Sequence, residues 1–372
     1  MNSIERTVTE LFCSNFKDKI NKNENYDEYI SSLKKDKIER LLKINAVIED
    51  NNSKLAHVLA ISTHKKNIVV AEFKKNIKEI YTNIMKNVNE NVIKQLEIYL
   101  KEYKNNIMEI NLPNIKYSLH FIELLNINCI AKVKYQKKEN IIYLYTPTEI
   151  KELLKDILKN DKIKKENRKN NIYKSNLHNL ISTYGIISIK KLTDIYNNIY
   201  GKIDESTIVQ NIIANAMFDE NIKLAMTEEG YIAYGLDFEN EDDALEFFYS
   251  LPENIEYKMY TQKEYEEIGE GTYHYDFKEF DELYDFLEMN FNMSEEEIYD
   301  FDDMFVLDYI FSYQLDANIA KKNLSNNLDK LFMGLNISDK AYISKLILSI
   351  AENYPNFNYK GHTYNEIKNK YK

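Results

Sequence analysis

The sequence has no tryptophan and few residues that break helices or cross-link chains. Its 372 residues include 8 Gly, 4 Pro and 2 Cys. Because Gly and Pro disfavour helix interiors, their scarcity favours helices over long irregular loops. Cys13 and Cys129 have no metal-like spacing and no further cysteines to join, so we expect two reduced thiols. We expect no cofactor and no bound metal.

Membrane, export and catalytic signatures are missing as well. No run approaches the roughly 18 apolar residues of a membrane span. The opening MNSIERTVTELF lacks the apolar centre of a signal peptide, so we expect a cytoplasmic protein without membrane contact. The 6 His are scattered without HExxH spacing, and no G-x-S-x-G, Walker or G-x-G-x-x-G motif occurs. We therefore expect no enzymatic activity.

Charge is distributed unevenly along the chain. The formal net charge is −11, with 29% charged and 44% hydrophobic residues, as in globular proteins. Residues 1–200 carry 35 Lys and Arg against 24 Asp and Glu, whereas residues 201–300 carry 5 against 28. A basic front could meet phosphate, and an acidic body would repel it. Two solvated surfaces of opposite sign are the plainer interpretation.

The clearest fold signal runs from Ser175 to Tyr234. Three apolar stripes at helical spacing precede two short apolar segments around TEEG, which is the order of a winged-helix unit. Gly185 stands where the first helix would stop. Ser188 and Asp204 are predicted to cap the second and third helices.

A second winged-helix-like unit is predicted over 88–158. Two helical stripes precede an alternating hairpin, CIAKVKYQKKENIIYLY, with KKEN as its turn. The exit TPTEIKELL predicts a helix capped by Thr146, with Pro147 at its first position and Glu149 completing a capping box. Residues 159–174 are polar and basic without an apolar stripe, which is typical of a linker.

The predicted fold class is mainly α, with small β-hairpin wings. The sequence divides into a helical N-terminal region 1–87, a winged-helix-like unit 88–158, a basic linker 159–174, a winged-helix-like unit 175–235 and an acidic helical domain 236–372. Capping boxes are predicted in the last region at Thr261 with Glu264 and at Ser294 with Glu297.

Three segments together resemble an uncharacterised family of low-GC bacterial proteins. SSLKKDKIERLLK is similar to a SAP or Rho N-terminal helix, and STYGIISIKKLTDIYN to the family's winged-helix-like centre. The tail resembles N-x-x-x-x-x-x-x-G-H-T-x-x-E, with Tyr364 at a position that is Pro in the family and Phe357 at a position that is Trp. Its matching residues are Asn353, Gly361, His362, Thr363 and Glu366. Many members carry a SecA-type zinc motif after this tail; it is absent here, so the resemblance implies no structural zinc.

The leading functional hypothesis is a nucleic-acid-associated regulatory protein that binds duplex DNA without catalysis. Lys and Arg side chains release counterions from phosphate and so supply sequence-independent affinity. The hairpin and the linker supply eight candidates: Lys132, Lys134, Lys137, Lys138, Lys164, Lys165, Arg168 and Lys169. The predicted third helix of the 175–235 unit, at the position that enters the major groove, carries no Lys or Arg. Only Gln210, Asn211 and Asn215 could read bases there.

The alternative hypothesis is a protein–protein interaction adaptor or inhibitor. Its contact would be the acidic stretch 237–303, which could mimic the charge of DNA and meet a partner with a basic surface. Asp300, Asp302, Asp303 and Asp308 have the chemistry for Mg²⁺ or Ca²⁺, but their spacing fits no calcium loop and lies in a predicted helix. The sequence predicts no oligomeric state.

Overall fold

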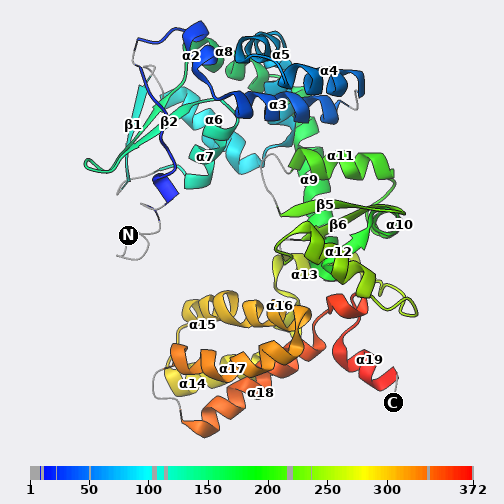
Figure 1. The fold of residues 1–372 in the computed structure, drawn as a ribbon. Helices are drawn as coiled ribbons and strands as arrows, with labels where there is room; N and C mark the ends of the chain where they lie inside the picture. Colours follow the sequence, from blue (N-terminus) through cyan, green and yellow to red (C-terminus); the bar gives the residue numbers. More distant parts are fainter. Residues whose placement is uncertain are drawn as a thin grey trace. The chain divides into compact units, whose positions relative to one another are not determined.

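The computed structural model describes residues 9, 12–21, 23–49, 52–102, 107–112, 116–215, 221–235, 237–332 and 336–370. The protein is mainly α-helical, with two three-stranded antiparallel sheets (Figure 1). This confirms the fold class expected from the scarcity of Gly and Pro. The chain divides into two compact units, residues 1–173 with 213–218, and residues 174–212 with 219–372.

The first unit combines helices with one small sheet. Its elements are α2 (Tyr26–Ser32), α3 (Lys35–Ile48), α4 (Asn52–Ser62), α5 (Lys66–Asn87), α6 (Glu90–Glu102), β1 (Ile107–Asn111), α7 (Leu119–Ile127), β2 (Lys132–Gln136), β3 (Ile141–Tyr145), α8 (Thr148–Leu158) and the first half of α9 (Asp161–Tyr184). One apolar cluster runs from Cys13 to Ile163, so residues 1–87 and 88–158 contribute to the same core.

The sheet of the first unit has the strand order β1-β3-β2. The predicted hairpin is present, with Val133 opposite Leu144 and Tyr135 opposite Ile142. Strand β1 was not predicted; it pairs Ile110 with Ile142 on the other side of β3. Because strand residues alternate between faces, Val133, Ile142 and Leu144 all turn into the core.

The start of α8 differs from the prediction. Pro147 is the N-cap residue, and no side chain caps the helix. The Thr146 hydroxyl is buried and bonds instead to Tyr99 Oη at 2.8 Å and the Ile130 carbonyl at 3.1 Å. The predicted capping box is therefore wrong, because a core hydrogen bond holds the hydroxyl that would have capped the helix.

The basic segment 159–174 is also not an irregular linker. Residues Asp161–Tyr184 form one helix, α9. Its inward face in the first unit combines Ile163 with Asn167, which is 2% exposed. The Asn167 amide donates to the carbonyls of Met85 at 3.0 Å and Val88 at 2.7 Å, at the end of α5. Polar residues that hydrogen-bond to the helix-end carbonyls thus take the place of an apolar stripe. The absence of such a stripe is what indicated a linker.

The second unit begins in the second half of α9 and, apart from residues 213–218, continues to the C-terminus. Its elements after α9 are β4 (Ile186–Ser188), α10 (Ile189–Ile199), α11 (Glu205–Asn215), β5 (Ile222–Thr227), β6 (Gly230–Gly235), α12 (Glu241–Ser250), α13 (Gln262–Glu270), a 3-10 turn Tyr273–Asp276, α14 (Lys278–Phe291), α15 (Glu295–Phe301), a π-helical turn Asp302–Val306, α16 (Leu307–Leu315), α17 (Ala317–Leu331), α18 (Ile337–Asn353), a 3-10 turn Phe357–Tyr359 and α19 (Tyr364–Lys370).

The three helices α9, α10 and α11 and the β5–β6 hairpin follow one another in the predicted order, whereas the short strand β4 was not predicted. Gly185 ends α9 with a positive φ of 68°, and the Ser188 hydroxyl accepts from Lys191 N at 3.3 Å. Asp204 accepts from Thr207 N at 2.8 Å and so caps α11. The sheet order is β4-β6-β5, with Thr227 opposite Gly230 across the TEEG turn. The predicted capping boxes of α13 and α15 are both present.

The C-terminal segment folds onto the Gly185 turn within the second unit. Phe357 is fully buried against Gly185, where a Cβ would have no room. Gly361, with φ of 84°, lies against the Tyr184 ring and accepts a hydrogen bond from Tyr260 Oη at 2.6 Å. Glu366 and Thr363 exchange the two hydrogen bonds of a capping box. Gly361, Thr363 and Glu366, three of the residues that carry the resemblance of the tail, therefore have packing and capping roles.

Candidate nucleic-acid interface

The structure places the eight predicted cations on two separate parts of the first unit. Four belong to the β2–β3 hairpin, and four lie on α9. Figure 1 shows the hairpin at the left edge of the first unit, away from α9. The two groups therefore form two surfaces rather than one.

Three hairpin lysines are exposed. Lys134 is on β2, and Lys137 and Lys138 occupy the turn before β3. Asn140 closes this turn with a positive φ of 58°, and its side chain accepts from Tyr135 Oη at 2.8 Å. The exposed turn carries two adjacent cations at its tip, as a phosphate-contacting wing would.

Lys132 does not belong to this surface, which corrects the prediction. It is 5% exposed, and its Nζ lies 2.5 Å and 2.6 Å from the two carboxylate oxygens of Glu24. The same Nζ lies 5.1 Å from the centroid of the Tyr29 ring. An ammonium group that is buried, ion-paired and over an aromatic face cannot reach phosphate.

The helical form of α9 brings its cations into register. Lys162, Lys165 and Lys169 follow the spacing i, i+3, i+7 and are all exposed. At about 3.6 residues per turn these positions share one face. Over the part of the chain that is described, none of the three has an ion-pair partner, and Lys169 lies 5.3 Å from the Tyr173 ring centroid. We name these three residues the α9 stripe.

Lys162 is not among the predicted residues, because helical spacing has no meaning in a segment predicted to be a linker. The signal was present as the i, i+3, i+7 recurrence of lysine. Lys164 and Arg168, which were predicted, lie beside the stripe and face α6 instead. Lys164 Nζ is 3.1 Å from Glu97 Oε1, and Arg168 Nε is 3.7 Å from Glu90 Oε1.

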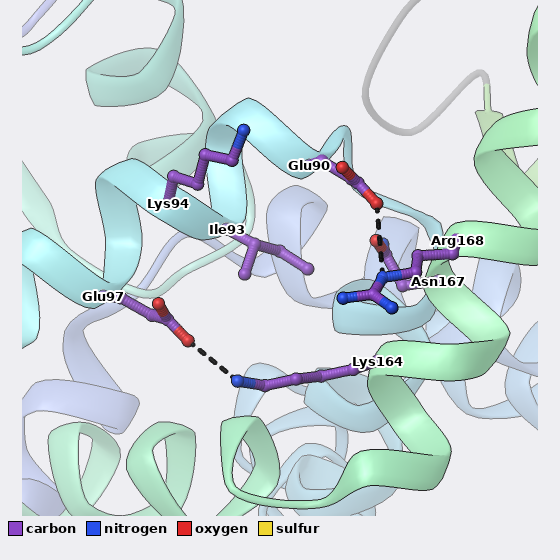
Figure 2. A pocket seen from close by; sticks show the side chains of 7 residues that line it. All are labelled: Glu90, Ile93, Lys94, Glu97, Lys164, Asn167 and Arg168. Carbon is purple, nitrogen blue, oxygen red and sulfur yellow. Dashed lines mark hydrogen bonds and ion pairs between the residues drawn. The ribbon is translucent and has the colours of Figure 1, made fainter.

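A pocket opens between α6 and α9 at these two ion pairs (Figure 2). Its volume is about 140 Å³. Ile93 supplies an apolar wall. The lining residues are Glu90, Ile93, Lys94, Glu97, Lys164, Asn167 and Arg168.

The second unit offers little to nucleic acid. Helix α11, at the position of a major-groove reader, has no Lys or Arg and begins with Glu205. Asn211 is nearly buried and donates to the Thr207 carbonyl at 2.8 Å. Gln210 is half-buried, and the Asn215 side chain lies outside the described residues. Helix α11 has no cation that could contact a duplex. Fewer of its amide side chains are exposed to contact base edges than the sequence suggested.

The acidic region contains a buried pair that the sequence did not indicate. His274 Nε2 lies 2.7 Å from Asp302 Oδ1, with the two side chains 0% and 1% exposed. Asp302 is among the carboxylates whose residue type has the chemistry for a divalent cation; in the structure it faces His274 inside the unit. Burial, together with the nearby Asp302, raises the pKa of the Tyr275 hydroxyl above its ordinary value.

The remaining chemistry is sparse. Cys13 and Cys129 are both buried and form no disulfide, as predicted, and burial raises the pKa of the Cys129 thiol to about 12. Across the described ranges, no group of three or more His, Cys, Asp or Glu could hold a metal ion. Within the same ranges no helix is both long and apolar enough to cross a membrane.

Comparison with known proteins gives no indication of function, so the function has to be argued from this geometry. No family model, no curated protein and no solved structure matches the chain.

Proposed function

We propose that the protein binds nucleic acid without catalysis, through phosphate contacts made by its first unit, as a regulator acting on DNA. The observation that carries this proposal is the α9 stripe. Lys162, Lys165 and Lys169 are held in line by a helix and are exposed. A row of cations along one helix face matches a polyanion, and the release of its counterions provides affinity.

The hairpin provides a second contact in this proposal. Lys134, Lys137 and Lys138 are exposed at the edge of the same unit. Because they lie apart from α9, they would meet a different part of the strand or duplex. Contacts of this kind position a nucleic acid without reading its sequence. We place this binding in the cytoplasm.

The test is a fluorescence anisotropy titration of duplex DNA at about 50 and 200 mM salt. The wild-type chain is compared with Lys162→Glu/Lys165→Glu/Lys169→Glu and with Lys134→Glu/Lys137→Glu/Lys138→Glu. We expect the α9 variant to lose at least about tenfold in affinity at the lower salt. The slope of log affinity against log salt concentration should fall by the equivalent of about three phosphate contacts.

The matched control is Lys322→Glu/Lys330→Glu/Lys345→Glu. These three lysines are exposed on the second unit and change the net charge by the same amount. The control should retain most of the wild-type affinity. Absence of salt-sensitive binding in the wild type, or equal affinities for the α9, hairpin and control variants, would overturn the proposal.

A protein-binding role for the acidic helices is the second candidate. Met289 on α14 and Met304 in the π-helical turn are 76% and 80% exposed. Glu288 and Asp303 are their exposed neighbours in the sequence. Methionine adapts to varied partner surfaces, and flanking carboxylates would favour a basic one. Parallel affinity capture with the wild type and Met289→Lys/Met304→Lys tests this: a partner retained equally by both counts against it.

A further inference from the structure

The pocket between α6 and α9 holds an arginine whose ion pair is loose. The 3.7 Å separation of Arg168 Nε from Glu90 Oε1 exceeds hydrogen-bond distance. The Arg168 side chain is 74% exposed. Figure 2 shows its two terminal nitrogens directed away from Glu90, towards the space beside Ile93 and Lys164. The planar edge that suits a phosphate is therefore available to a ligand.

The charges around the pocket nearly balance without a ligand. Lys94, Lys164 and Arg168 line the pocket together with two carboxylates, Glu90 and Glu97. Lys164 is the more firmly held cation, at 3.1 Å from Glu97. Both pairs are partly exposed, so each contributes little to stability and exchanges readily for another anion. The carboxylates position the cations and compete with an incoming oxyanion.

The pocket and its surroundings suit a strand of nucleic acid better than a small molecule. The α9 stripe continues the positive charge along the helix that lines the pocket, with Lys165 and Lys169 adjacent in sequence to Lys164 and Arg168. A single phosphate in the pocket would leave those neighbouring cations unused. A chain of phosphates would meet both.

We propose that the α6–α9 pocket holds one backbone phosphate of the bound nucleic acid, through the Arg168 fork with Lys164 beside it, in competition with Glu90. This inference rests on the proposed function. It adds a defined phosphate position and an internal carboxylate that weakens binding until it is displaced.

The test uses the full chain in the same anisotropy titration, with Arg168→Lys and Glu90→Gln. Arg168→Lys keeps the charge but removes the fork, and we expect affinity to fall roughly threefold to tenfold with little change in salt slope. Glu90→Gln removes the competitor, and we expect tighter binding. Glu152→Gln, on exposed α8 surface of the same unit, is the control for the loss of one negative charge.

The outcomes separate the two proposals. If the wild type does not bind DNA, the proposed function fails. If it binds, but Arg168→Lys matches the wild type or Glu90→Gln gains no more than Glu152→Gln, only the pocket assignment fails. A calorimetric titration with inorganic phosphate provides the other arm: micromolar binding without DNA would overturn the backbone assignment in favour of a small ligand.

Discussion

His274 and Asp302 show how one buried contact can hold a local backbone irregularity in place. Asp302 opens the π-helical turn Asp302–Val306, and its carboxylate bonds to His274 Nε2 at 2.7 Å. His274 packs against the rings of Phe280 and Tyr354, at centroid distances of 5.0 Å and 6.1 Å. A wide turn of this kind is less favourable than an α-helical turn, and a fully buried polar partner compensates for it.

Removing one member of this pair should destabilise the second unit markedly. Asp302→Ala leaves the imidazole buried without its acceptor, and we expect a loss of about 3 kcal/mol in the free energy of unfolding. Asp302→Asn keeps an acceptor oxygen and should cost less. Urea unfolding followed by tyrosine fluorescence measures both, since the chain has no Trp. Equal losses for Ala and Asn would show that neither the shape nor a neutral acceptor oxygen suffices at this position and that the carboxylate charge is required.

Lys132 and Lys134 show what a sequence can and cannot say about one side chain. Both lie on the same face of β2, as alternation predicts, yet only Lys134 is exposed. The difference comes from Glu24, 108 positions earlier in the chain, which covers Lys132. Local spacing predicts which face of a strand a residue lies on. Which segment covers that face depends on the tertiary fold.

At the scale of elements, α9 depends on asparagine as much as on apolar residues. Asn167, Asn170 and Asn171 all donate to carbonyls at the end of α5, at Met85, Val88, Lys86 and again Val88, over distances of 2.7–3.1 Å. The last carbonyls of a helix have no partner within it, so these amides replace water there. The contact fixes α9 to α5 and thereby sets the direction of the α9 stripe.

Asn167→Ala should therefore loosen α9 within the first unit. The Met85 carbonyl would lose its donor and the Val88 carbonyl one of its two donors, and we expect a loss of about 1–3 kcal/mol in the free energy of unfolding. The control is Lys165→Ala, an exposed change on the same helix, which should be nearly neutral. Native-state hydrogen exchange of the α9 amides, together with urea unfolding, provides the measurement. If Asn167→Ala is as stable as Lys165→Ala, solvent satisfies those carbonyls and the contact is incidental.

Local signals predicted elements well where the deciding contact was local. Ser188, Asp204 and Gly185 each act within a few residues of the helix end that they define, and the structure confirms all three. Thr146 failed because its hydroxyl bonds to Tyr99, 47 positions away. Strand β1 and the continuous α9 were missed for the same reason, since pairing with β3 and docking on α5 decide them.

At the scale of the whole chain, the two units differ in what they expose. The first presents exposed lysines on α9 and on the hairpin, whereas the second presents acidic first turns, as in α12 and α15. The composition of the sequence predicted this division of charge. It could not predict which cations are engaged by nearby carboxylates, and that distinction decides the candidate site. Of the eight predicted residues, Lys132 is buried, Lys164 and Arg168 line the pocket, and the other five are exposed.

Within the second unit, the C-terminal segment joins parts that are distant in the sequence. Lys258 N donates to the Lys360 carbonyl at 3.0 Å, and Lys258 Nζ lies 2.8 Å from Glu366 Oε1. Partial burial alone would raise the pKa of the Glu366 carboxyl. The Lys258 ion pair and the Thr363 N–H outweigh it and hold that pKa below its ordinary value. The ionised carboxylate thus favours the folded segment.

The sign of this shift fixes a pH dependence. A carboxyl with a lowered folded-state pKa contributes stability above its unfolded pKa and loses it as the pH falls through the folded value. Glu366→Gln should therefore lower Tm at pH 7 and matter progressively less below about pH 4. Because Glu366 is 45% exposed, we expect the loss at neutral pH to stay under about 1 kcal/mol. Thermal unfolding of both proteins at pH 7, 5 and 3.5 measures it. The amide of Gln can still accept from Thr363 N but cannot form the ion pair with Lys258. A Tm difference that stays constant with pH would therefore show that the ionised carboxylate is not the source of the stability.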